Sequence, residues 1–477
     1  MEESVQQKTS GITMKDKIGY AMGDMGGTLF LGMIGSFLQV FYSKILQIPQ
    51  EKIGVLLAAL RVWDGINDPL WGMLVDRRPA GKHGKYRPYL RMFALPFALC
   101  GILIFTKIPG LNETQYLLYA YITHILYEFF YTTLNIPLGS MASVITDDGQ
   151  ERSVLSTFRS LGSGIGSLPA AILLPLFIYT EQDGIEVLDA NKMFLAVCVF
   201  AVLSVTIHMF AFKLTKERVP PPPAEEKHNI FQTIGTLLRN RPYLALCFAS
   251  MLLIGSSLYT QAVYQFLYID YFKTPKLYSL VTIATYLPTV LLLPVLNQLV
   301  LRFGKKRLCT WGLLLSAVAN TAALLMHTTN PYIFMVFCFF SGLGGTFLNM
   351  QIWALITDVL DHQTLLSGKH EEGTCYALFF FMRKIGQTLA GSGSSFLLAA
   401  IGYDEKLPVQ TPLVAGKMYT TATLVPAIAF TLMTFAMAFW YPLTPEKEEA
   451  NREELRRRRA ALEAETQLPA ETIPGEA

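Results

Sequence analysis

The sequence predicts an all-helical membrane protein whose twelve transmembrane helices form two six-helix bundles. Of its 477 residues, 52% are hydrophobic and only 16% are charged, whereas soluble proteins are nearer one quarter charged. The mean hydropathy is +0.36. The apolar residues fall in runs of about twenty, which is the length that crosses ~30 Å of hydrocarbon at about 1.5 Å per residue. The longest polar stretch divides these runs into two sets of six.

Each of the twelve runs is long and apolar enough to be a span. The first six lie at Tyr20–Tyr42, Ile53–Val75, Leu90–Phe105, Tyr116–Ile145, Val154–Tyr179 and Met193–Phe212. The second six lie at Tyr243–Tyr271, Tyr278–Leu301, Leu308–Met326, Tyr332–Leu355, Tyr376–Ile401 and Tyr419–Trp440. We therefore predict an N-terminal bundle at 1–212, a C-terminal bundle at 243–441 and a cytoplasmic tail at 442–477.

The polar stretch between the sixth and seventh runs is predicted to be a cytoplasmic linker at 213–242. It contains four consecutive prolines, Pro220 to Pro223, and a proline run cannot remain helical. The basic connection after the second run corresponds in place to that after the eighth, as two bundles related by a parallel repeat would give.

The distribution of basic residues predicts the orientation. Lys and Arg gather in the connections after the even-numbered runs, for example at Arg77, Arg152 and Arg302, which places both termini and the linker in the cytoplasm. The polar start, Met1–Lys17, lacks the apolar region of a cleavable signal, so the first span is retained. We expect a monomeric, multi-pass protein of the bacterial inner membrane, surrounded by membrane lipid.

Several functions are excluded by composition and motifs. A net charge of +3 without a continuous basic face gives no support for a nucleic-acid partner. The six cysteines show no CxxC spacing and lie in or beside apolar runs, which argues against a disulfide framework or a zinc site. The sequence contains no phosphate-binding glycine loop, catalytic triad or metal-ligand spacing. We expect neither an enzyme nor a bound cofactor.

The strongest functional signal lies in the second run. The motif RVWDGINDP places Arg61, Asp64 and Asp68 on one helical face near the middle of the span. A charge at that depth costs at least ~2.5 kcal/mol, and two carboxylates also repel each other. A fixed basic side chain or a mobile Na⁺ or H⁺ must compensate them. Because Arg61 neutralises only one acid, we favour a mobile coupling cation, with Asn67 included in the predicted cation site. Pro69 is expected to break the helix there and free carbonyl oxygens.

Polar residues in the fourth run could complete the site. Thr132 offers the uncharged oxygen that a Na⁺ site with Asp64 and Asp68 would need, and Asn135 can donate to and accept from a hydroxylated solute. Tyr131 is a further candidate for solute binding. The alternative, that these side chains only hold helices together, remains open.

Two basic residues lie deep in apolar runs and need anionic partners. They are Arg159 in the fifth run and Lys384 in the eleventh. Arg383, beside Lys384, points to a different helix face. In the tenth run, Asn349 is expected to line a cavity.

Motifs distributed over the chain resemble one family. They read KIGYAMGDMGG, RVWDGINDP, GKYRP, TLNIPLGS, ERSVLSTFR, WALITDVLDHQTLLSGKHEEG and FFFMRKIGQTLAGS. In these the chain resembles the glycoside-pentoside-hexuronide:cation symporters, the melibiose-permease-like branch of the major facilitator superfamily. The resemblance implies two bundles that work by alternating access. It also implies cation ligands at Asp64, Asp68 and Thr132, and basic residues at Arg159 and Lys384 that link the bundles around the sugar and cation sites.

The chain departs from the galactoside-transporting pattern of that family. Thr28 and Asn135 stand where that pattern has acids on helices one and four, and Asn349 replaces a tryptophan. With those acids gone, Arg159 and Lys384 are expected to lack partners, which a carboxylate on the substrate would supply.

The substrate interpretation follows from this expectation. It favours a glucuronide or another hexuronide and a place near the glucuronide-permease branch. One alternative is a symporter for a neutral pentoside, such as a xyloside, or for a galactoside. A second is a sodium-coupled lysolipid carrier of the same fold. A third is a non-transporting sensor, which would tolerate loss of the coupling acids that this chain retains.

Overall fold

The computed structural model describes residues 11–81, 83–182, 184–219, 235–367 and 372–467. The first six long helices are α1 (Met14–Val40), α2 (Gln50–Arg77), α3 (Arg87–Ile104), α4 (Glu113–Ile145), α5 (Gly149–Ile178) and α6 (Ala190–Leu214). The second set comprises α8 (Arg241–Phe266), α9 (Tyr278–Leu292), α10 (Leu296–Phe303), α11 (Lys305–Met326), α12 (Pro331–Ser367), α13 (Glu372–Ala400) and α14 (Pro412–Phe435). Half of the predicted linker, including Pro220 to Pro223, lies outside the described residues.

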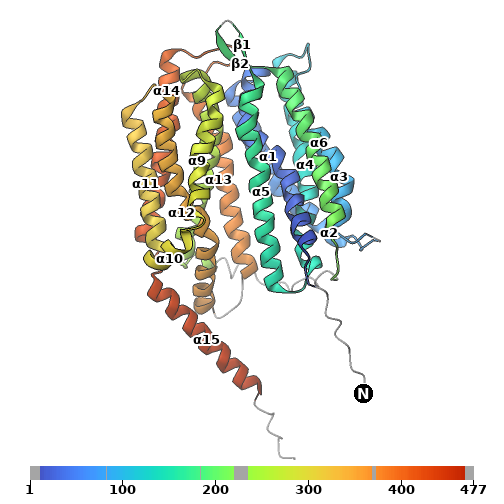
Figure 1. The fold of residues 1–477 in the computed structure, drawn as a ribbon, viewed down its shortest axis with the longest axis vertical. Helices are drawn as coiled ribbons and strands as arrows, with labels where there is room; N and C mark the ends of the chain where they lie inside the picture. Colours follow the sequence, from blue (N-terminus) through green and yellow to red (C-terminus); the bar gives the residue numbers. More distant parts are fainter. Residues whose placement is uncertain (1–10, 82, 183, 220–234, 368–371, 468–477) are drawn as a thin grey trace, which may run out of the picture.

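Shorter elements sit at the helix ends. Three π-helical segments, η1 (Phe41–Ile45), η2 (Leu267–Tyr271) and η4 (Ala436–Trp440), continue α1, α8 and α14, and the 3₁₀ turn η3 (Pro275–Leu277) precedes α9. The strands β1 (Tyr179–Gln182) and β2 (Ile185–Leu188) form an antiparallel hairpin after α5. The final helix, α15 (Pro445–Gln467), extends away from the bundles at the end opposite the β1–β2 hairpin (Figure 1).

The predicted helical membrane architecture is confirmed. Counting α9 and α10 as one span, the two sets each supply six spans that stand side by side (Figure 1). By length and composition, eight described helices can cross a membrane, and the α9–α10 pair makes a ninth candidate. The remaining long helices of the bundles are α2, α4 and α13. Of the charged residues of the predicted site, Asp64, Asp68 and Lys384 lie on α2 and α13, whereas Arg159 lies on α5.

The structure adds one bend to the predicted helices and contradicts one predicted break. The eighth predicted span is bent by 67° between α9 and α10, which the sequence did not indicate. By contrast, α2 runs without a break from Gln50 to Arg77, so Pro69 frees no carbonyl for a cation by ending the helix. Hydropathy predicts the length of a span, whereas a bend depends on the neighbours against which the helix packs.

The close packing of equivalent helix pairs supports two repeated bundles. A Cβ on Gly162 of α5 would lie 2.1 Å from the backbone oxygen of Ala21 in α1, and a Cβ on Gly386 of α13 would lie 2.2 Å from that of Met251 in α8. Only glycine permits these approaches. The pairs α1–α5 and α8–α13 hold the same places in the two sets of six.

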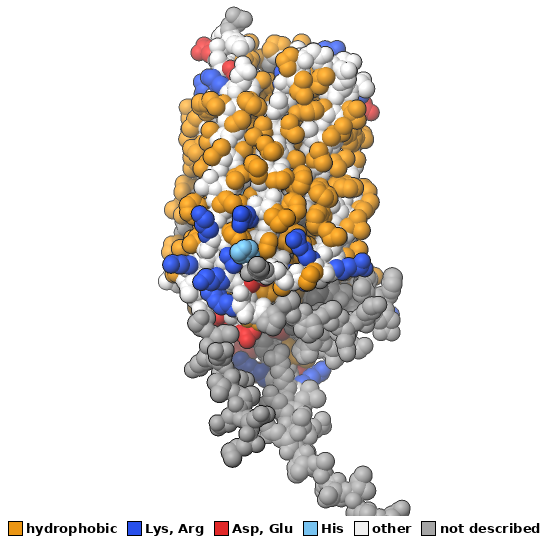
Figure 2. Space-filling model, turned by 90° about the vertical axis from the view of Figure 1, so that its right-hand side faces the viewer, with side chains coloured by type: hydrophobic (Ala, Val, Ile, Leu, Met, Phe, Trp, Pro, Cys, Tyr) orange, Lys and Arg blue, Asp and Glu red, His pale blue; other side chains and the backbone are white. Residues whose placement is uncertain are grey.

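The surface is that of a membrane-embedded body with one basic end. On the face in Figure 2, hydrophobic side chains cover the length of the bundles, and Lys and Arg side chains gather near the end from which α15 projects. This is the end that the sequence assigns to the cytoplasm. The β1–β2 hairpin marks the opposite end, which we call the periplasmic end.

Candidate functional site

The first part of the candidate site is an ion pair within α2. Arg61 Nη1 donates a hydrogen bond to Asp64 Oδ2 at 2.9 Å, and the Asp64 side chain is 12% exposed. The other oxygen, Asp64 Oδ1, is buried and has no partner among the described residues. Nearby on the same helix, Asn67 is also buried, and its side-chain nitrogen has no partner in the described ranges. These two side chains therefore keep unused hydrogen-bonding capacity inside the bundle.

Asp68 connects the two bundles. Its Oδ1 accepts a hydrogen bond from Thr132 of α4 at 3.0 Å, and its Oδ2 pairs with Lys384 Nζ of α13. The side chains of Asp68 and Lys384 are 35% and 49% exposed, and both lie well inside their helices. The bridge is thus open on one side, and an ion can approach it.

Arg159 of α5 is paired with an acid that sequence reasoning missed. Its Nε donates to Asp24 Oδ1 of α1 at 3.0 Å, and its Nη2 donates to Asn135 Oδ1 of α4 at 2.8 Å. The expectation that Arg159 and Lys384 lack partners was therefore wrong. The signal for Asp24 was present, since it is an acid within the first apolar run.

A second missed acid is Glu128 of α4. It is buried, its Oε1 lies 3.5 Å from His124 Nε2, and it is close enough to Asp64 for the two carboxylates to repel each other. Like Asp24, it is an acid in the middle of an apolar run. Its position adds one more negative charge to the group around Asp64.

The remaining predicted residues of the N-terminal bundle lie in different surroundings. Tyr131 stacks on Tyr127 with ring centroids 6.2 Å apart. Thr28 is buried against Gly166 of α5, and its hydroxyl donates to the carbonyl oxygen of Asp24 at 3.0 Å. The structure therefore does not bring the Thr28 hydroxyl to the ion pairs.

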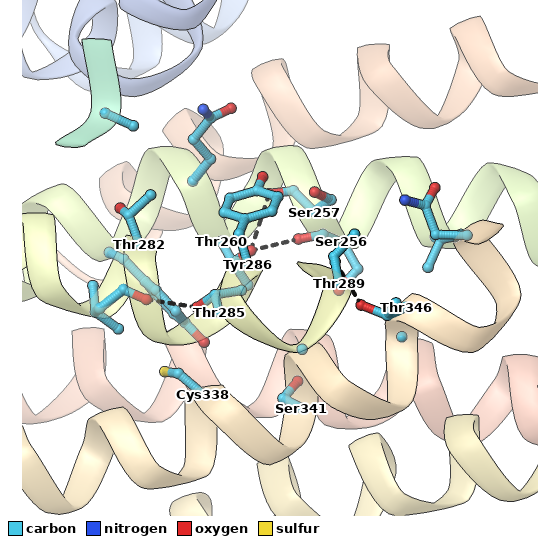
Figure 3. Close-up of a pocket in the computed structure, with 18 of the residues that line it drawn as sticks. Ser256, Ser257, Thr260, Thr282, Thr285, Tyr286, Thr289, Cys338, Ser341 and Thr346 are labelled. Carbon is cyan, nitrogen blue, oxygen red and sulfur yellow. Dashed lines mark hydrogen bonds between the residues drawn. The ribbon is translucent and has the colours of Figure 1, made fainter. Parts of the chain in front are cut away.

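A polar cavity lies mainly in the C-terminal bundle, between α8, α9 and α12. The space that its side chains enclose measures about 1050 Å³, including the part open to solvent. Figure 3 shows its hydroxyl side chains projecting from neighbouring helices. These are Ser256, Ser257, Thr260, Thr282, Thr285, Tyr286, Thr289, Ser341 and Thr346. Of the predicted residues, Asn349 lines this cavity, and Arg383 lines it as well.

Apart from Asn349, the sequence did not reveal the lining of this cavity, because its Ser and Thr residues are individually ordinary. Ser and Thr hydroxyls often bond to their own helix, as Thr282 does to Tyr278 O at 2.9 Å. Their spacing at Thr282, Thr285 and Thr289 places them on one face of α9, and this was the available signal.

The bundles contact each other at the periplasmic end. Lys44 Nζ of η1 lies 3.1 Å from Asp270 Oδ1 of η2, and the Asp270 side chain is fully buried. Closer to the centre, Gln39 donates to Ser394 Oγ at 2.7 Å. These contacts join the bundles at the end marked by the β1–β2 hairpin, whereas the Asp68–Lys384 bridge lies closer to the other ends of α2 and α13.

The residues around Asp68 have the chemistry of a hard-cation site. Carboxylate and hydroxyl oxygens from Asp68 and Thr132 are ligands suited to Na⁺. Within the described ranges, no three His, Cys, Asp or Glu side chains are grouped as a multivalent metal site would require. The arrangement therefore suits exchange of a monovalent cation or a proton.

The fold and the buried charges define a polytopic membrane transporter. A family model described as MFS/sugar transport protein matches residues 19–445. The chain belongs to this family, which confirms the predicted melibiose-permease-like resemblance at family level and the prediction of a transporter rather than an enzyme.

Relatives and solved structures agree with this membership. The glucuronide carrier protein homolog of Escherichia coli (strain K12) is 29% identical over 432 residues, covering 90% of this chain and 93% of that protein. The putative glycoside/cation symporter YagG of the same strain is 28% identical over 460 residues, covering 94% and 96%. The crystal structure of the nucleoside transporter NupG has a TM-score of 0.62 at 12% identity, covering 90% of this chain and 100% of that one. The last similarity concerns the fold alone.

Proposed function

We propose that this protein is a cation-coupled symporter that imports a sugar-type solute, most favourably a glucuronide or other hexuronide, across the bacterial inner membrane. The observation that carries the proposal is the group of buried acids on α2 and α4, joined to α13 of the other bundle through Asp68 and Lys384. The similarity to a glycoside/cation symporter and to a glucuronide carrier homolog supports the choice of solute.

The proposed cation site comprises Asp64, Asp68, Asn67 and Thr132. Asp64 and Asn67 have unpartnered polar atoms, and Asp68 is partly exposed. A Na⁺ or H⁺ that binds here offsets the repulsion between acids. Because Lys384 shares the Asp68 carboxylate, the cation competes with the bridge that holds the bundles together.

The proposed solute path runs between the bundles. Asn135 and Arg159 border it from the N-terminal bundle, and Asn349 from the C-terminal cavity, with Tyr131 and Lys384 as further candidates. The hydroxyl-rich lining favours a hydroxylated solute over a lipid tail. It also suits a neutral pentoside or galactoside, which is the second candidate because Arg159 and Lys384 already have carboxylate partners.

We also propose that both termini face the cytoplasm and that the protein works as a monomer in membrane lipid. The gathering of basic residues at the end of the bundles from which α15 projects supports the orientation.

Uptake into proteoliposomes tests the function. Purified protein should accumulate a labelled glucuronide when a Na⁺ or H⁺ gradient is imposed. Asp64→Asn or Asp68→Asn should reduce accumulation to the level of empty vesicles but leave solute exchange without a gradient. Glu113→Gln, an exposed acid at the start of α4, is the control. Unchanged gradient-driven accumulation by both variants would refute the cation site.

A further inference from the structure

Two consecutive basic residues on α13 face opposite surroundings. Lys384 pairs with Asp68 of the N-terminal bundle. Arg383 turns into the C-terminal bundle, where its Nη1 donates to Ser250 Oγ of α8 at 2.9 Å. Its guanidinium also lies over the ring of Trp353, 5.9 Å from the centroid. Position 383 therefore places a permanent positive charge at the polar cavity, which it helps to line.

This charge has no carboxylate partner among the described residues. The described contacts of Arg383 are one neutral hydroxyl and two aromatic faces, those of Trp353 and Phe379. The other deep cations differ, because Arg61, Arg159 and Lys384 each pair with an acid. A desolvated guanidinium without a counter-ion is costly, so a bound anion at this place would be strongly favoured.

The rest of the cavity provides groups for hydroxyls. Ser256 Oγ is buried in the wall and has no partner within the described part of the chain. Thr289 Oγ1 and Thr346 Oγ1 hydrogen-bond to each other across α9 and α12 at 2.9 Å (Figure 3). Asn349 is exposed in the same cavity. The lining thus combines one positive charge with several neutral donors and acceptors.

We propose that Arg383 is the anchor for an oxyanion, a carboxylate or sulfonate, of a polyhydroxylated solute that binds in the C-terminal cavity. The inference rests on the proposed function and deepens it, since it assigns the acid group of the solute to Arg383 instead of Arg159 or Lys384. The guanidinium keeps N–H groups that Ser250 does not use, and its planar geometry suits two-point contact with such an anion.

The position of Arg383 also relates the solute to the cation. The solute anchor and the Asp68 bridge arise from adjacent residues of one helix. A shift of α13 that changes one contact therefore changes the other.

Binding of a matched pair of solutes tests the anchor. The pair is an aryl glucuronide and the aryl glucoside with the same aglycone, which differ only in the carboxylate. We expect wild-type protein to bind the glucuronide more tightly. Arg383→Gln should weaken glucuronide binding by about 10- to 100-fold, as the loss of a charged hydrogen-bonding partner does, and glucoside binding by less than about threefold. Arg383→Lys keeps the charge but loses the planar guanidinium. Its affinity for the glucuronide should lie between those of the wild type and Arg383→Gln.

A control variant and a second measurement keep the outcomes distinct. Arg302→Gln removes a positive charge from an exposed site at the end of α10 and should leave both affinities unchanged. Retained glucoside binding shows that Arg383→Gln is folded. Equal glucuronide affinity in wild type and Arg383→Gln, or equal losses for both solutes, would overturn the anchor while leaving symport intact. A wild-type protein that binds neither solute would contradict the proposed function itself.

Discussion

Charge neutralisation is incomplete around the ion pairs of α2. Three acids are each matched by a permanently basic side chain, namely Asp24 by Arg159, Asp64 by Arg61 and Asp68 by Lys384. Among the described residues, the fourth acid, Glu128, has an ion-pair contact with His124 alone, at 3.5 Å, and that ring is charged only when it is protonated. The excess negative charge therefore resides with Glu128 and its neighbour Asp64, and a mobile cation is most favoured beside them.

Glu128→Gln should weaken binding of the coupling cation. Charges in direct contact interact by roughly 4 kcal/mol at an effective dielectric constant near 20. For an acid beside the site rather than in contact with the cation, we take about half of this, which corresponds to about thirtyfold in affinity. We expect the Na⁺ or H⁺ concentration at half-maximal uptake to rise by about that factor, measured in proteoliposomes. Glu113→Gln on the same helix should have no effect, because that side chain is 45% exposed and lies far from the acids. Wild-type cation dependence in Glu128→Gln would show that this acid takes no part.

The sequence could reveal the type of these residues but not their pairing. An acid or base in an apolar run stands out by its cost, and Asp68, Lys384 and Arg159 were identified on that ground. Their partners follow from the packing of helices, since Lys384 is 316 residues from Asp68 and Arg159 is 135 residues from Asp24. The expectation of unpaired cations was wrong for two reasons. Asp24, one turn from Thr28 on α1, pairs with Arg159, and Asp68 of α2 pairs with Lys384.

At the scale of elements, the π-helical ends of α1 and α8 form the closure at the periplasmic end. These helices hold equivalent places in the two bundles, and Lys44 of η1 pairs with Asp270 of η2. Asp270 also accepts a hydrogen bond from Tyr403 at 2.8 Å. The pair is almost fully buried, so its removal leaves an uncompensated charge.

Lys44→Ala should therefore shift the protein towards a state open to the periplasm. Without Lys44, the Asp270 carboxylate becomes hydrated when the periplasmic end opens, which favours the open state. A change of about 1.4 kcal/mol in the free energy between the closed and open states shifts the ratio of their populations tenfold. We expect a cysteine at Ser36, buried on α1, to react about tenfold faster with an impermeant maleimide added from the periplasmic side. Lys52→Ala is the matched control, because its pair with Glu113 is about half exposed and lies within one bundle. Equal labelling of the two variants would argue against the closure.

The elements themselves were largely predictable from the sequence. Span length and apolar composition are set by the bilayer, and the helices follow from them. The bend between α9 and α10 and the β1–β2 hairpin were missed, because both depend on contacts with other segments. The three helices that hydropathy identifies least well, α2, α4 and α13, carry Asp64, Asp68, Glu128 and Lys384. Asp24 and Arg159, however, lie on α1 and α5, which pass as candidate spans, so weak apolar character marks only part of the site.

At the scale of the whole molecule, one ion pair links the two bundles at the level of the acids. Lys384 behaves as an internal cation that occupies Asp68 while the periplasmic end is closed. If the coupling cation binds at Asp68, as proposed, it competes with Lys384 for that carboxylate. Cation binding would then loosen the attachment of α13, which also carries Arg383 in the lining of the polar cavity. By thermodynamic linkage, the solute must change the affinity for the cation by the same factor.

Lys384→Gln should break this linkage while strengthening cation binding. In the wild type, saturating cation should raise solute affinity by at least about fivefold, within the usual range of coupling energies, and the solute should raise cation affinity equally. Without the competing ammonium group, the variant should bind the cation more tightly, because Asp68 is left uncompensated. Its solute affinity should then change by less than about twofold with cation. Titration calorimetry in both orders measures the two factors, with Lys384→Arg as the charge-conserving control. If cation and solute still raise each other's affinity in Lys384→Gln by the wild-type factor, coupling passes between the bundles by a route other than the Asp68 bridge.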